Sequence, residues 1–203
     1  MKKNQLIALG IMLLGAFCCT KPIEEEDKSE ETISAIKGEY QLIGMIWEKE
    51  PEREFDFDKD GKTSTLYEEL SALYGFGFEK LVVWTGPQGT IKNYKIYATI
   101  DYPIQDVSIS EETAGTPVTH VGGVTQWPIN IVGEVKKTGE INWAETVIKY
   151  TSGRGLGTIL WGGKGSIKSY SPEIIEAEID YKIYLPERDI FITGPVLLTF
   201  SKR

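Results

Sequence analysis

Apolar and polar residues alternate along most of the chain after residue 36. The clearest run, residues 94–102, places five apolar or aromatic side chains on one side: Tyr94, Ile96, Ala98, Ile100 and Tyr102. Residues 175–183 alternate in the same way, with acids and a lysine on the opposite side. Successive side chains of a β-strand point to opposite faces, so the pattern predicts strands with one buried face. Strands of this kind are typical of antiparallel sheets.

Shorter runs extend the pattern over the rest of this region. In residues 41–47 the alternation puts Ile43, Met45 and Trp47 on one face. Clusters of Gly and Pro separate the runs, as expected for turns between strands. Further strands are predicted at 78–85, 104–109, 118–124, 129–136, 141–150, 156–161 and 190–201.

One helix is predicted after residue 65. Thr65 is followed three residues later by Glu68, which is the spacing of a capping box. The leucines at 66, 70 and 73 then share one helical stripe. No rhythm of alternating strands and helices follows, which argues against a parallel sheet. The fold class is therefore all-β, an antiparallel barrel or sandwich of about 8–10 strands with one short helix, in a single domain over 36–203.

The first residues have the organisation of a secretion signal. Lys2 and Lys3 precede twelve apolar or small residues, Leu6–Phe17, a stretch too short to span a bilayer of about 30 Å as a helix. The run leads into the only two cysteines, Cys18 and Cys19. This junction resembles the lipobox of bacterial lipoproteins, which implies a signal peptide over 1–18 and lipidation of Cys19. Cys18 is the alternative, but bulky Phe17 directly precedes it.

Residues 19–35 are expected to form an acidic, flexible tether, because this segment has few apolar groups to bury. The acids that follow the cysteine resemble the export signal of Bacteroidetes lipoproteins carried to the cell surface. The opening strand Gly38–Leu42 and the closing segment Gly194–Arg203 are similar to those of lipocalin-like lipoproteins of the same bacterial group. The resemblance implies an outer-membrane, lipid-anchored protein on the periplasmic or cell-surface face.

Composition removes several classes of function. The formal net charge of −8 makes nucleic acid an unfavourable partner, because like charges repel the phosphate backbone. Outside the adjacent cysteine pair the chain has no thiol, and His120 is its only histidine. Thiolate catalysis and cysteine-based zinc sites therefore have no residues to build on. We expect a protein that is not an enzyme.

The sharpest local motif is Asp56-Phe-Asp-Lys-Asp-Gly61. Asp56, Asp58 and Asp60, with Ser64 after them, stand at positions 1, 3, 5 and 9 of a calcium-binding loop. Tyr67 occupies position 12, where such loops carry a bidentate glutamate. The alternative interpretation is a turn at Asp60-Gly61 that leads into the helix. A structural calcium ion at these residues is the one cofactor that the sequence suggests.

Two functions remain open at this point. The first is a non-enzymatic binding barrel for a small apolar ligand or a glycan, in which aromatic side chains line the mouth. The second is a structural or interaction subunit of an envelope or surface complex, docking a protein partner. A lumen with room for a ligand favours the first, and a filled barrel favours the second.

Overall fold

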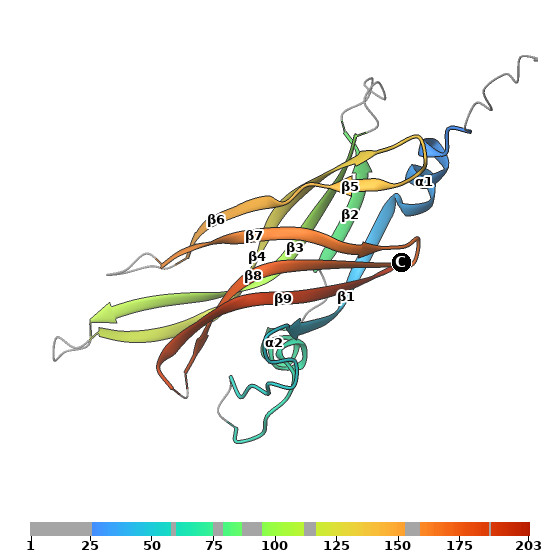
Figure 1. Cartoon of the computed structure of the whole chain (residues 1–203). Coiled ribbons are helices and arrows are strands. Elements are labelled where there is room, and N and C mark those ends of the chain that lie inside the picture. Colours follow the sequence, from blue (N-terminus) through green and yellow to red (C-terminus); the bar gives the residue numbers. More distant parts are fainter. Residues whose placement is uncertain are drawn as a thin grey trace, which may run out of the picture.

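A single antiparallel sheet dominates the structure (Figure 1). The computed structural model describes residues 26–57, 60–74, 79–86, 95–111, 117–152, 159–186 and 188–203. The strands of these residues lie in the order β5-β4-β3-β2-β1-β9-β8-β7-β6. They are β1 (Gly38–Trp47), β2 (Lys80–Thr85), β3 (Lys95–Glu111), β4 (Pro117–Val135), β5 (Ile141–Trp143), β6 (Thr146–Ser152), β7 (Ile159–Tyr170), β8 (Ile174–Leu185) and β9 (Ile190–Lys202). The all-β antiparallel prediction is confirmed.

The sheet curls into a half-barrel because consecutive strands form its two edges. β5 pairs with β4 through Ile141–Trp143, and β6 pairs with β7 through Thr146–Ser152. Only Ala144 and Glu145 separate β5 from β6, so the segment 141–152 joins both edges of the sheet. On the other side, the first strand β1 pairs antiparallel with the last strand β9. Except for β5 and β6, which form the two edges, each strand thus neighbours the one before it in the chain, as in a meander.

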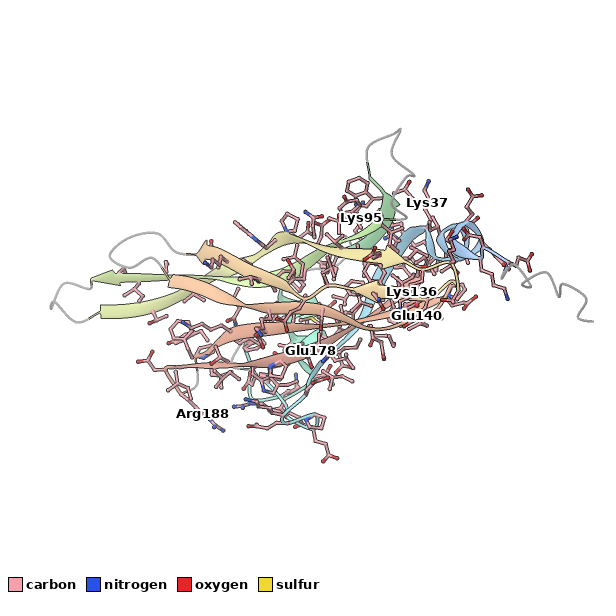
Figure 2. The ribbon with its side chains drawn as sticks, turned by 45° about the horizontal axis from the view of Figure 1, so that its top comes forward. Lys37, Lys95, Lys136, Glu140, Glu178 and Arg188 are labelled. Carbon is pink, nitrogen blue, oxygen red and sulfur yellow. The ribbon has the colours of Figure 1, made fainter. Side chains whose placement is uncertain are left out.

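The half-barrel has two distinct ends (Figures 1 and 2). At the α1 end lie helix α1 (Ser29–Ile36), the turn 136–140 and the C-terminus. At the opposite, hairpin end lie the paired ends of β3 and β4, of β6 and β7, and of β8 and β9. Helix α2 (Leu66–Tyr74) belongs to the connection from β1 to β2 and packs against β1.

The inward faces of the strands form one core. Ile96, Ala98, Ile100 and Tyr102 of β3 are all fully buried, as their alternation predicts. The prediction for β1 is wrong in one position, because a bulge between Leu42 and Gly44 shifts the register against β9. A bulge places one extra residue in a strand and turns it to the other face. Ile43 therefore points outward and is 51% exposed, while Leu42, Met45 and Trp47 face the core.

Helix α2 forms as the sequence predicts. Thr65 Oγ1 accepts the Glu68 backbone N–H, and the Glu68 carboxylate accepts the Thr65 N–H at 3.2 Å, which completes the capping box. Leu66 and Leu70 are buried against the sheet. The third leucine of the predicted stripe, at 73, has a side chain outside the described set.

Helix α1 corrects the predicted tether, which was expected to reach residue 35. Ser29–Ile36 are helical, and Ile36 and Ser29 are buried. The Lys28 N–H donates to the carbonyl of Lys137 at 2.9 Å, so the chain is fixed to the domain from residue 28. The acidic composition of 24–31 concealed the helix, because its stability comes from packing at one end of the barrel rather than from its own sequence.

Candidate functional site

The middle of the half-barrel is filled by aromatic side chains from opposite walls. Tyr102 of β3 and Tyr181 of β8 are at most 1% exposed, and their ring centroids lie 5.8 Å apart in an edge-on arrangement. β3 and β8 are not neighbours in the sheet, so this contact crosses the interior. The two walls therefore meet inside the barrel, and the interior at this level is a packed core.

A buried amide joins the same two strands nearer the hairpin end. The Gln105 side chain, 1% exposed, accepts the Tyr184 N–H at 2.7 Å and donates to the Tyr184 carbonyl at 3.3 Å. This pair of bonds satisfies both polar groups of one peptide position, as a neighbouring strand would. Tyr184 Oη also donates to Asp189 in the β8–β9 turn at 2.6 Å. The interior is thus closed below the hairpins by side chains.

A third aromatic pair lies toward the α1 end. Trp143 of β5 packs over Gly133 of β4, and its ring meets Tyr170 edge-on at 6.3 Å. Tyr170 Oη accepts the backbone N–H of Ile141 at 2.8 Å. The indole N–H of Trp143 is buried and finds no acceptor among the described residues. A hydrogen-bond acceptor brought to this atom would therefore satisfy it.

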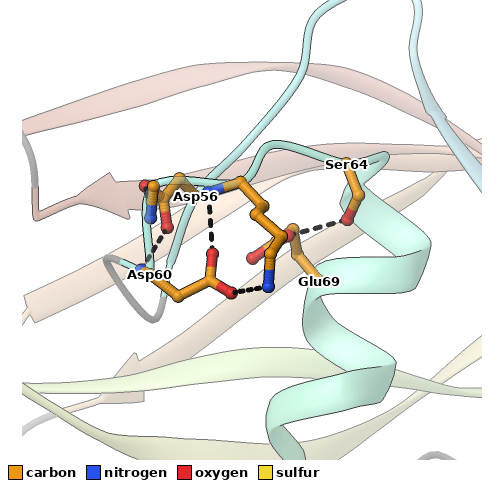
Figure 3. Close-up of polar contacts among 6 residues, drawn as sticks. Asp56, Asp60, Ser64 and Glu69 are labelled. Atoms are coloured by element: carbon orange, nitrogen blue, oxygen red, sulfur yellow. Dashed lines mark hydrogen bonds and ion pairs between the residues drawn. The ribbon is translucent and has the colours of Figure 1, made fainter.

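The predicted calcium loop is a hydrogen-bonded turn in its described part (Figure 3). The Asp56 carboxylate accepts the backbone N–H groups of Asp60 and Gly61, each at 3.1 Å. The Asp60 carboxylate accepts the backbone N–H and the side-chain ammonium of Lys62. Both hydrogen bonds lower the pKa of Asp60, and the backbone bond has the larger effect. The glycine has a φ of +83°, the left-handed conformation of a turn. These contacts agree with the turn interpretation of Asp60-Gly61.

The other two predicted calcium ligands are Ser64 and Asp58. Ser64 turns away from the aspartates, because its hydroxyl donates to Glu69 at 2.7 Å. Asp58 lies outside the described residues. Among the residues that the structure describes, no cluster of three or more acids, histidines or cysteines could hold a metal ion. The calcium site stays a prediction, with Asp56 and Asp60 already engaged by backbone donors.

The wall between β4 and β6 is interrupted. β4 pairs with β5 only over Gly133–Val135, extended by the Ala144 N–H to Val132 carbonyl bond of 2.8 Å. Across the described residues, no strand pairs with the second edge of β4 over 117–131 or with the second edge of β6. We call these two edges the seam. The Cδ1 atoms of Ile129 and Ile148 each lie 3.2 Å from the position that a Cβ of Gly165 would occupy. These two side chains close the seam from inside near β5.

The outer face beside the seam is apolar and basic. Val147 of β6 is 67% exposed, the highest value among the large exposed hydrophobic side chains of the described residues. Lys149 follows it on the same strand and is exposed. On β7, Lys164 pairs with Glu145 at 2.9 Å, and this hydrogen bond raises the pKa of the lysine.

A second ionic group lies farther from the seam. Lys168 pairs with Glu178 at 2.7 Å, and this bond is the main reason that the pKa of Glu178 is lowered. A hydrogen bond to Glu178 in turn raises the pKa of Glu48. All three side chains are exposed or half-buried on the outer surface, where ion pairs contribute little to stability.

The sequence contained a signal for the seam that the strand prediction missed. Residues 141–150 were expected as one strand, but the inward positions change phase within it. Ile141 and Trp143 face inward at odd-numbered positions, whereas Ile148 faces inward at an even-numbered position. A shift of one residue in a period-2 pattern marks an irregularity. It falls at Ala144 and Glu145, where the chain changes partner from β4 to β7.

The remaining candidates lie outside the described residues or have undescribed side chains. Cys18 and Cys19 belong to the undescribed first 25 residues, and the side chain of His120 in β4 is not described. No helix in the described part of the chain has the length and apolar character needed to cross a membrane. No protein-family model, no curated protein and no solved structure matches this chain.

Proposed function

We propose that this chain is a lipid-anchored cell-envelope protein that works as a non-enzymatic docking subunit. In this proposal the seam receives an extended segment of an envelope protein partner. The observation that carries it is the interruption of the wall, which leaves the backbone edges of β4 and β6 unpaired across the described residues. Unpaired strand edges are templates for another strand, and many recognition domains use them in this way.

The two edges are not equivalent. Backbone groups of alternate residues point to the same side of a strand. Because the Val132 carbonyl points to β5, the groups of Asn130 and Pro128 point to the seam. Proline has no N–H, and natural sheets use it to block edges. β6 has no proline in its seven residues, so we assign the docking edge to β6.

The outer face of β6 defines the chemistry of the partner. Side chains directly opposite each other in an antiparallel pair interact, so Val147 favours an apolar residue in the added strand. Lys149 favours an acidic residue two positions away, on the same face. The partner segment is therefore extended, with an apolar and an acidic side chain two positions apart on one face.

The packed interior also supports docking over storage of a ligand. A small-molecule site encloses most of its ligand in a cavity of about 300–1,000 Å³. Here Tyr102 and Tyr181 meet across the interior, and Gln105 joins β3 to β8 above them. The anchor itself is supported by the sequence, through the apolar run that ends at Cys19. The proposed location is the outer membrane, on its periplasmic or surface face.

The docking edge can be tested with a photo-crosslinking amino acid placed at Val147 in intact cells. Ile190, in the β8–β9 hairpin, is also an exposed aliphatic residue at 44% and provides the matched control position. We expect one discrete crosslinked protein from position 147, attached through an extended segment, and none from 190. Equal products at both positions, or none at 147, would contradict the proposal.

A small apolar ligand or a glycan is the second candidate, and one observation favours it. The buried indole N–H of Trp143 lacks an acceptor among the described residues, and a ligand oxygen would satisfy it. Native mass spectrometry of the protein purified from its own envelope distinguishes the two functions. A bound small molecule that is lost in Trp143→Phe favours the ligand, whereas an unliganded mass favours docking.

A further inference from the structure

The α1 end of the barrel is where the chain would enter from the membrane. Lys28 is bound to Lys137 at 2.9 Å, and Ser29 is completely buried. Gly139 packs so closely that a Cβ there would lie 2.7 Å from Thr32 Oγ1 and 3.4 Å from the Lys28 Cβ. The start of α1 and the turn 136–140 therefore form one rigid unit.

This attachment shortens the reach of any lipid anchor. From Cys19 to Lys28 the chain has nine residue steps, which span at most about 30 Å even when fully extended. That limit is covalent and holds for every conformation of the intervening residues. The hairpin of β3 and β4 is longer than this reach. β4 has 19 residues, and at about 3.3 Å per residue it is roughly 60 Å long. It runs from near the α1 end to the hairpin end (Figure 1).

We propose that the α1 end faces the lipid surface and that the hairpin end points away from it. This proposal rests on lipidation of Cys19. If the hairpin end faced the lipid, Lys28 would stand about 60 Å from the membrane, twice the distance that the tether spans. The occupant of the α1 end is therefore a lipid bilayer, and the paired strand ends of β3 with β4 and of β6 with β7 belong to the distal surface.

Charge is not what orients the molecule. The α1 end carries exposed lysines, including Lys37 and Lys137, but also the acids Glu30 and Glu31 of α1 itself. Anionic lipids attract clustered cations, and mixed charges give little net attraction. Orientation in this proposal comes from the short tether, so it depends on tether length and only weakly on salt.

The test uses the lipidated protein in phosphatidylcholine vesicles that contain a headgroup-labelled nitroxide lipid. Processing at Cys19 removes Cys18, and the lipid occupies Cys19, so the mature chain has no free thiol. A fluorophore can then be attached at Lys37→Cys or at Arg188→Cys, which lie near opposite ends (Figure 2). Both residues are exposed. We expect quenching several-fold greater at 37 than at 188.

Two controls make the outcome decisive. A chain that begins at Thr20 has no anchor, and we expect little quenching at either position. Insertion of about 20 Gly/Ser residues before Glu26 raises the fully extended reach of the tether to about 95 Å, longer than β4, and we expect the difference between the two positions to shrink. Equal quenching at 37 and 188 with the natural tether, or greater quenching at 188, overturns the orientation. An unmodified Cys19 in the mass spectrum overturns the anchor as well, so the two failures are distinguishable.

Discussion

The two ends of the barrel are closed by different physical means. At the α1 end an added helix is held by backbone and hydroxyl hydrogen bonds, including those from Tyr40 to the carbonyls of Ile36 and Pro172. Toward the hairpin end the opposite walls approach each other directly, through the Tyr102–Tyr181 contact and the bonds of Gln105 to Tyr184. The strands that extend past this point do not have to close the barrel, which leaves them available for contacts outside it.

The largest expected effect tests whether the hairpin end is closed by packing. Tyr181→Ala removes a ring from a fully buried site and should lower the free energy of unfolding by about 3–5 kcal/mol. Urea denaturation measures it. Asp180→Ala, at the exposed neighbouring residue, is the control and should cost only about 1 kcal/mol, because it loses one exposed hydrogen bond, from the Lys164 N–H at 2.9 Å. Similar small losses in both variants would mean that the walls do not meet as described.

Gln105→Leu tests the amide that joins β3 to β8. The substitution leaves the N–H and carbonyl of Tyr184 buried without these partners, at a cost of about 1–3 kcal/mol. Gln41→Leu is the matched control, because the Gln41 amide oxygen accepts its hydrogen bonds from the exposed side chain of Arg203. A control loss equal to that of Gln105→Leu would contradict a special role for the buried bond.

Gly139→Ala tests the α1 end. Its φ of +87° and the close Thr32 hydroxyl both oppose a side chain, and we expect a loss of about 1–2 kcal/mol. Adding Thr32→Ala should recover only the part that comes from the contact. Gly162→Ala serves as a control, since the nearest atom to its Cβ would be at an ordinary 3.6 Å. Full recovery in the double variant would show that the backbone conformation costs nothing.

Tyr40→Phe should have the smallest effect, about 1 kcal/mol, through loss of the bonds to Ile36 and Pro172. Burial, assisted by the charge of Glu173, raises the pKa of Tyr40 to about 12. The fold thus favours the neutral phenol. The stability that the Tyr40 hydroxyl contributes is complete below pH 10 and is lost as the pH rises through about 12. Absorbance titration of the folded protein should show less tyrosine ionisation near pH 12 in the variant. An unchanged titration would place that ionisation on other tyrosines.

Strand identity was readable from the sequence because burial follows a period of two. Ile96–Tyr102 and Ile175–Ile183 have the inward faces that alternation predicts. The helix after Thr65 was also predictable, since its capping box is a local hydrogen-bond pattern. Ile43 was placed on the wrong face because a bulge depends on the partner strand, which alternation does not reveal.

The candidate site was less accessible to prediction. Alternation does not give the order of strand pairing, so it could not show that β5 and β6 form opposite edges of one sheet. Gln105 bonds a residue 79 positions away, and no local pattern marks it. The aspartate motif had a clear spacing, yet its meaning depended on whether Asp56 accepts from the backbone or from an ion. In the structure it accepts two backbone N–H groups.

The pairing of β1 with β9 brings residues 40 and 202 together, and it has a consequence for biogenesis. The sheet cannot join β1 to β8 until the 13 residues of β9 are present. Contacts between such distant positions form slowly, because a long loop must close first. A product that lacks β9 would therefore retain an exposed β1 edge, which is prone to aggregation and degradation.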